Sequence, residues 1–253
     1  MNPWMYVGAA ASLFVLAAMF VPLERAWAAR QQPVLSREFA LDVVFFVGQY
    51  VWWNAVSISV LIYLHRSWQH LAPFACNTWP TWLQLILALV LGELATYWLH
   101  RAFHRFDVLW RIHAVHHSST HLDWIAGHRE HPLDGMLIQL SMNLPAILLG
   151  FSFAAFGPLI LFRGLWAIVV HSNTSLPLGP LRWILGAPQL HRYHHAAAPA
   201  RVANFANLSP WIDALFGTHH VASDETYAIG RLTQPRIRRP WSAYVRHLLF
   251  RVE

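Results

Sequence analysis

Four long stretches of this chain contain almost no charge, and this feature constrains the fold more than any other. Trp4–Leu23 carries no charged residue, Phe39–Leu64 carries only Asp42, and Trp79–Leu99 carries only Glu93. Each stretch has about the length that an α-helix needs to cross a bilayer. A helix also satisfies its backbone hydrogen bonds within one segment, as a lipid environment requires. These stretches therefore predict three membrane-spanning helices.

The fourth stretch, Leu137–Phe162, is uncharged, and its apolar character continues past Arg163 to Val170. It contains four residues that interrupt helices: Pro145, Gly150, Gly157 and Pro158. We therefore expect a helical hairpin that dips into the membrane and starts and ends on one side. The predicted fold class is all-α, an integral membrane protein with about four spans, including this hairpin.

We expect one domain over residues 1–253 with three parts. Residues 1–78 form the N-terminal spans, 79–220 form the part that carries most histidines, and 221–253 form a basic C-terminal segment. From Ser172 onward the chain is polar and rich in arginine, with Pro and Gly throughout. This composition predicts a cap of short helices and loops.

Arginines predict the orientation in the membrane. They are frequent in the loop after the first span and in the region after the third, whereas the loop after the second span has only Arg66. The positive-inside rule then places the cap in the cytoplasm. The net charge of +6 comes from arginines beside apolar segments, which argues against nucleic-acid binding. The lone Cys76 excludes internal disulfides, cysteine-based zinc sites and a resident iron–sulfur cluster.

Histidines are concentrated where the apolar stretches end. One pair has the spacing i, i+4, and two triplets have the spacing i, i+3, i+4, which projects rings from one helical face. The members are His100 and His104, then His113, His116 and His117, then His191, His194 and His195. Eight imidazoles exceed what one metal ion can use, so they predict two metal ions with open positions. Imidazole suits iron, zinc, copper and nickel alike.

The histidines allow other interpretations. A single pair at helical spacing is usually a surface or capping feature. A histidine-rich membrane protein for metal binding or transport, without redox catalysis, is the alternative function, although a transporter should have ligands along a path at mid-membrane. A zinc hydrolase should carry an H-E-x-x-H type carboxylate, which is absent from the sequence.

The runs HRAFH, HAVHH and HRYHH resemble the histidine boxes of the fatty acid hydroxylase / sterol desaturase superfamily of integral membrane di-iron enzymes. The likeness covers about residues 90–220 and includes YWLHRAFH, LWRIHAVHHSS, REHPLDG, HSNTSLPLGPLRW and NFANLSPWIDALFGT. The resemblance implies a four-helix-type membrane architecture with a cytosolic metal cap. It also implies two iron ions (Fe2+/Fe3+) and O2-dependent hydroxylation or desaturation of a C–H bond in a membrane lipid, such as a carotenoid, a sterol or an acyl lipid.

The resemblance adds two ligands to the boxes. His171 lies where members supply an extra ligand, and His131 matches the His-Pro element as a ligand or as a donor to one. The predicted metal ligands are thus His100, His104, His113, His116, His117, His131, His171, His191, His194 and His195. Glu93, two helical turns before His100, is expected to orient an imidazole, and Asn173 to support His171. Asp123, Asp134 and Asp213 have less support for such a role.

The remaining histidines are not expected to join the site. They are His65, His70, His121, His128, His219, His220 and His247. Zinc is expected to replace iron in some purified samples, because zinc binds such sites more tightly. The chain has no dinucleotide fingerprint and no haem motif, so a separate ferredoxin or small cytochrome with its reductase is expected to supply electrons. A basic surface for docking such a partner, or for contact with lipid headgroups, is expected at Arg231, Arg236, Arg238 and Arg239.

Overall fold

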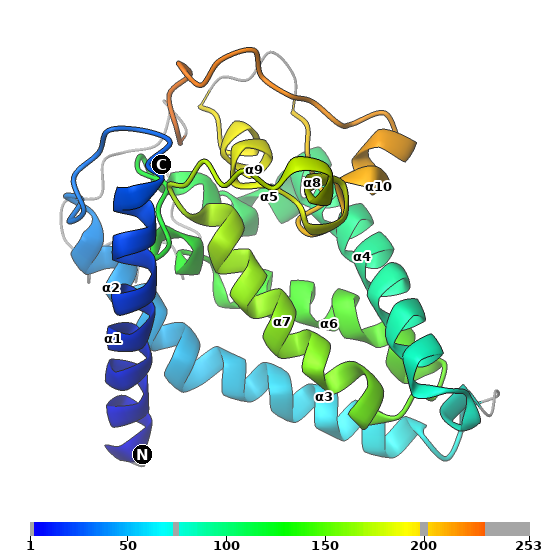
Figure 1. Cartoon of the computed structure of the whole chain (residues 1–253). Coiled ribbons are helices and arrows are strands. Elements are labelled where there is room, and N and C mark those ends of the chain that lie inside the picture. Colours follow the sequence, from blue (N-terminus) through cyan, green and yellow to red (C-terminus); the bar gives the residue numbers. More distant parts are fainter. Residues whose placement is uncertain (1–2, 73–75, 198–201, 231–253) are drawn as a thin grey trace.

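The computed structural model describes residues 3–72, 76–197 and 202–230 (Figure 1). Within these ranges the regular structure is helical and no β-strand is formed. Extended segments meet only in isolated bridges, between Ala28 and Thr174 and between Ala196 and Ile229. The predicted all-α fold class is confirmed.

Four long apolar helices dominate the structure, and each has the length and composition to cross a membrane. They are α1 (Pro3–Ala26), the continuous helix Phe39–Trp68, α4 (Thr81–Arg105) and α7 (Phe153–His171). The continuous helix consists of α2 (Phe39–Gly48), a π-helical turn η1 (Gln49–Trp53) and α3 (Asn54–Trp68). The π-turn was not predicted, because no proline or glycine pair marks it in the sequence. The spans predicted from the apolar stretches are confirmed.

The predicted hairpin is also present, and α6 (Pro132–Leu148) and α7 form its arms. Gly150 makes the reversal possible because it takes a φ of 72°, a left-handed conformation that other residues rarely adopt. Pro145 and Pro158 lie inside the helices and do not end them. Of the interruptions that we expected, only Gly150 lies between the two helices.

The hairpin packs against α4 through a close backbone approach and a buried ion pair. A side chain at Gly92 would collide with the Met142 carbonyl of α6, so only glycine permits this approach. Arg163 of α7 lies 3.2 Å from the Glu93 carboxylate. The same guanidinium donates hydrogen bonds to the carbonyls of Ala88 and Leu89. These contacts fix α4, α6 and α7 relative to one another.

Short helices form a cap at one end of the long helices, as the polar composition predicted (Figure 1). The cap contains α5 (Asp107–His113), η3 (His116–Ser118), η4 (Ala126–His128), η5 (Gly179–Leu181), α8 (Arg182–Leu185), α9 (Pro188–His194) and α10 (Pro210–Leu215). The last turns of α4 and α7 reach the same end. The fold therefore brings all histidine-rich segments together.

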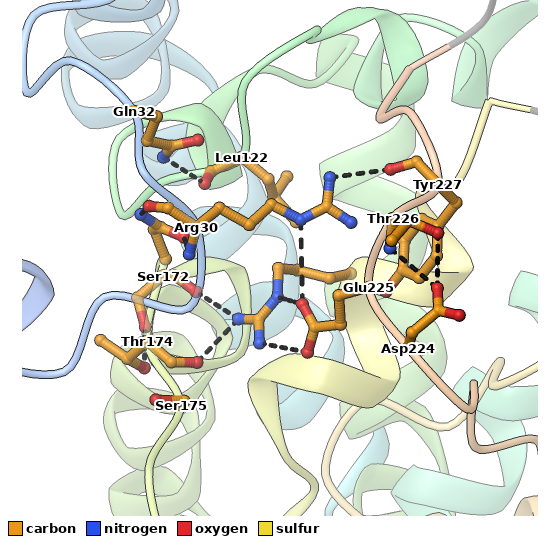
Figure 2. Close-up of polar contacts among 12 residues, drawn as sticks. Arg30, Gln32, Leu122, Ser172, Thr174, Ser175, Asp224, Glu225, Thr226 and Tyr227 are labelled. Atoms are coloured by element: carbon orange, nitrogen blue, oxygen red, sulfur yellow. Dashed lines mark hydrogen bonds and ion pairs between the residues drawn. The ribbon is translucent and has the colours of Figure 1, made fainter.

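A polar network joins residues 225–227 to α9, to the loop that contains Arg30 and to the loop that follows α7. Figure 2 shows Arg30 beside Glu225 and Tyr227, with the Ser172–Thr174 loop next to them. The buried Arg192 of α9 donates two hydrogen bonds to the Glu225 carboxylate and two more to carbonyls of that loop. The network thus holds the third histidine box against the loop that follows α7. The expected docking arginines, Arg231, Arg236, Arg238 and Arg239, lie outside the described residues.

Candidate metal centre

The structure brings nine of the ten predicted ligands together in two neighbouring groups. Within each group, one ring nitrogen from every histidine lies within 4.8 Å of the others. The five-histidine group contains His100, His104, His113, His117 and His194. The four-histidine group contains His116, His171, His191 and His195. The groups touch, since the rings of His117 and His195 stack with their centroids 4.3 Å apart.

Each histidine triplet is divided between the two groups. His113 and His117 belong to the five-histidine group, whereas His116 points into the other. The third box is divided in the opposite sense, because His194 joins the five-histidine group and its two partners join the four-histidine group. In both triplets the first and last histidines share a group and the middle one joins the other group.

Hydrogen bonds on the outer side of the rings fix their protonation. A carbonyl oxygen or a carboxylate accepts from Nδ1 in five of the nine histidines, so the proton lies on Nδ1 and a neutral ring has an unprotonated Nε2. The acceptors are Phe205 O for His100, Asp134 Oδ2 for His113, Arg129 O for His116, Ala167 O for His171 and Ala203 O for His194.

The inner nitrogens face one another at short distances. Nε2 of His100 lies 3.0 Å from Nε2 of His113, and Nε2 of His171 lies 3.0 Å from that of His116. Two unprotonated nitrogens repel each other at this distance unless a cation lies between them. Two ligands about 2.1 Å from one metal ion and at right angles would be about 3.0 Å apart. The donor set therefore fits a metal ion in each group.

The electrostatics favour the neutral, metal-binding form of these rings. Burial lowers the pKa of His194 to about 3, and it lowers the pKa values of His116 and His195 well below the usual value. Neighbouring imidazoles add to this effect for His116 and His195 by coulombic repulsion. Protonation of these three rings is thus disfavoured.

Further residues hold in place the carbonyl oxygens that accept hydrogen bonds from Nδ1. Asp213 receives hydrogen bonds from the backbone N–H groups of Phe205 and Ala206, which holds the carbonyl that His100 uses. Arg129 is fully buried between the carboxylates of Asp42 and Glu38, which holds the carbonyl that His116 uses. Sequence reasoning missed Arg129, because nothing distinguishes it from the surface arginines around it.

Three predicted site residues lie elsewhere. His131 is outside both groups, and its Nδ1 accepts from Leu133 N at 3.1 Å, which caps α6. Glu93 is paired with Arg163 and not with an imidazole, because a carboxylate within a span needs a counter-charge. Asn173 hydrogen-bonds to both backbone groups of Arg30 and so supports a loop. The carboxylate that does contact an imidazole belongs to Asp134, which the sequence supported less.

Most other histidines remain outside the two groups, as predicted. These are His65, His70, His121, His128, His219 and His220, and His247 lies outside the described residues. His128 was expected to have no role in the site, yet it is held inside the protein by Gln49. Gln49 lies about eighty residues away in sequence, so no local pattern links the two.

A cavity of about 660 Å³ extends from the two groups into the helical bundle. Histidines of both groups line one end, and the rest of the lining combines apolar side chains of α1, α3, α6 and α7 with polar side chains such as Gln139 and Asn207. Several of the lining side chains are also exposed on the outside of the bundle, with Val15 at 53%, Ile58 at 45% and Leu161 at 69%. The cavity thus reaches the surface of the long helices, where a bilayer would be.

These features define a class of protein: an apolar helical bundle with a two-part histidine site, suited to two metal ions, at one end of an internal cavity. Comparison with known proteins gives the family. The sequence model of the fatty acid hydroxylase family matches residues 85–218, more than half of the chain. The chain belongs to this family, and the resemblance noted in the histidine boxes is confirmed.

Relatives with assigned activities act on different lipids. Ornithine lipid hydroxylase OlsE of Rhizobium tropici is 37% identical over 57% of this chain and 44% of its own length. Alkylglycerol monooxygenase of Danio rerio is 30% identical over 72% of this chain and 39% of its own length. A methylsterol monooxygenase of Arabidopsis thaliana is 30% identical over 53% of this chain and 46% of its own length. The chain thus spans less than half the length of these relatives, and no solved structure matches it.

Proposed function

We propose that the protein is an oxidoreductase that hydroxylates or desaturates a C–H bond in a membrane lipid, using O2 and two iron ions. The observation that carries this proposal is the pair of histidine groups, with facing Nε2 atoms, at the end of a cavity that reaches the lipid-facing surface. Family membership and the activities of the relatives support the same reaction class.

Each of the two histidine groups would hold one iron ion. When bound, the irons supply the oxidising power that an unactivated C–H bond requires and that no side chain has. The protein's own part is orientation: Asp134 and the backbone carbonyls fix the tautomers of five rings, so that the Nε2 atoms of these rings are available as ligands. Zinc would also fit this donor set, so a zinc-loaded preparation is compatible with iron in the cell.

The cavity would hold the lipid tail and keep bulk water away from the metals. Helices α1, α3 and α7 contribute exposed lining side chains, so the tail would enter sideways from the bilayer. Gly164 of α7 belongs to this wall, and nothing lies within 4 Å of the position that a side chain there would take. A large residue at 164 would therefore narrow the access route.

Electrons would come from a separate protein, a ferredoxin or a small cytochrome with its reductase. This part rests on the sequence, which lacks dinucleotide and haem motifs. The cap would face the cytoplasm, where such donors are reduced; the distribution of arginines supports this orientation. The alternative of metal transport is not favoured, because the histidines lie at one end of the bundle and not along a path through it.

The experiment is lipid profiling of a bacterial host that expresses the chain together with a ferredoxin and its reductase. A lipid that gains one oxygen, or loses two hydrogens, should appear with the wild type and be absent with His104→Ala. His219→Ala is the matched control, since His219 lies outside both groups, and it should retain the product. Identical lipid profiles for the wild type, the His104 variant and the empty host, with iron bound to the wild type, would overturn the proposal.

A further inference from the structure

A chain of hydrogen bonds with a defined direction runs along the cavity wall near the four-histidine group. Gln49, the first residue of the π-turn η1, donates from Nε2 to the carboxyl oxygen Oε1 of Glu130. Its Oε1 accepts from Nδ1 of His128 at 2.5 Å. All three side chains line the cavity. π-Turns inside α-helices occur frequently at functional sites.

The direction of these hydrogen bonds determines which ring nitrogen of His128 remains available as an acceptor. An amide oxygen only accepts hydrogen bonds, so Nδ1 of His128 carries the ring proton. Burial lowers the pKa of His128 to about 3, so the ring is neutral. Its Nε2 is therefore an acceptor, and this atom is buried without a hydrogen-bond partner. His128 belongs to neither histidine group, so a metal does not account for the free acceptor.

Other residues of the same cavity also have unpartnered polar atoms. Gln139 Oε1 and Asn207 Oδ1 are buried acceptors without partners, and Trp166 Nε1 is a buried donor without one. Each such atom loses its hydrogen bonds to water on burial and carries a desolvation penalty. A pure hydrocarbon ligand would leave every one of them unsatisfied. A ligand with hydroxyl or amide groups can satisfy several, because such groups donate hydrogen bonds and also accept them.

We propose that His128 Nε2 accepts a hydrogen bond from the bound lipid and that the cavity selects lipids with a hydroxyl or amide N–H over plain hydrocarbons. Gln49 is the positioning residue that keeps the acceptor nitrogen on the correct side of the ring. The inference rests on the proposed function in that the ligand is taken to be the substrate. It assigns that substrate a chemical class and excludes an unsubstituted carotene.

The test is a binding measurement with a matched pair of lipids, hexadecylglycerol and its di-O-methyl ether. The purified, iron-loaded chain in nanodiscs is titrated with each lipid, and the dissociation constants are compared by native mass spectrometry. The wild type should bind the hydroxyl form about tenfold more tightly, as expected for one hydrogen bond to a buried acceptor. His128→Leu should bring this ratio close to one, with unchanged iron content. His219→Leu, a control outside the cavity, should keep the wild-type ratio.

Either of two binding results would overturn the inference: a wild type that binds both lipids equally, or a His128→Leu variant that keeps the full preference. Loss of iron in His128→Leu would also overturn it, because His128 would then act on the metal site. If that variant fails to fold, Gln49→Leu decides, and its ratio should fall several-fold. Because binding is read without turnover, these results stand even where no oxidised lipid is formed and the proposed function fails.

Discussion

The Asp134 carboxylate offers a way to weaken one ligand without removing an imidazole. Its Oδ2 lies 2.8 Å from His113 Nδ1, and the two side chains are only 3% and 4% exposed. A hydrogen bond to a charged group contributes about 1.5–3 kcal/mol. Since about 1.4 kcal/mol corresponds to a factor of ten, Asp134→Ala should weaken iron binding by about 10- to 100-fold, the range typical of residues that orient metal ligands.

The effect should be confined to one of two bound iron ions, because His113 belongs to the five-histidine group alone. Anaerobic competition for Fe2+ with a coloured chelator measures both affinities. Asp123→Ala is the matched control: this buried carboxylate accepts from the backbone of Ala126, so its loss should lower the melting temperature and leave both affinities unchanged. An Asp134→Ala protein with two wild-type affinities would refute the reasoning.

Three further predictions concern stability, measured as the melting temperature in detergent. Gly92→Ala should cost about 1–3 kcal/mol through overpacking against α6, whereas Gly164→Ala, in open space, should be neutral or slightly stabilising; equal effects would contradict the packing described. Burial raises the pKa of Glu130 to about 8, so the folded protein loses stability as the pH rises from about 4.5 to 8. Glu130→Gln should therefore raise the melting temperature more at pH 8 than at pH 5. An increase in melting temperature that does not depend on pH would contradict this prediction. Glu225→Ala leaves the buried Arg192 without its counter-charge and should lower the melting temperature, unlike Asp224→Ala, so similar melting temperatures would refute the role of the network.

The apolar stretches predicted the helices well because lipid leaves the backbone few alternatives. The spacing of the histidines predicted that eight of them would act together, and all eight lie in the two groups. It could not predict how they divide between two groups. The spacing places the rings of a triplet on one helical face, but which ring faces which group depends on how the cap segments pack together. Only the resemblance to the family identified His171.

The errors concern residues whose partners are distant in sequence. Glu93 lies on the helical face of His100, yet Arg163, seventy residues further on, takes its carboxylate. His131 is an exception, because it caps the helix that begins beside it and its partner is the nearby Leu133. The partner of His128 is in another span. Periodicity describes one helix at a time, whereas these roles depend on which helices pack together.

The central claim is that the two histidine groups each hold one metal ion, and metal counting tests it directly. The chain of residues 1–253 would be loaded anaerobically with Fe2+, freed of excess metal and analysed for iron per chain. We predict two irons for the wild type, and one each for His113→Ala and His171→Ala, which affect different groups. One iron or fewer in the wild type, or the loss of both irons in both variants, would contradict the account.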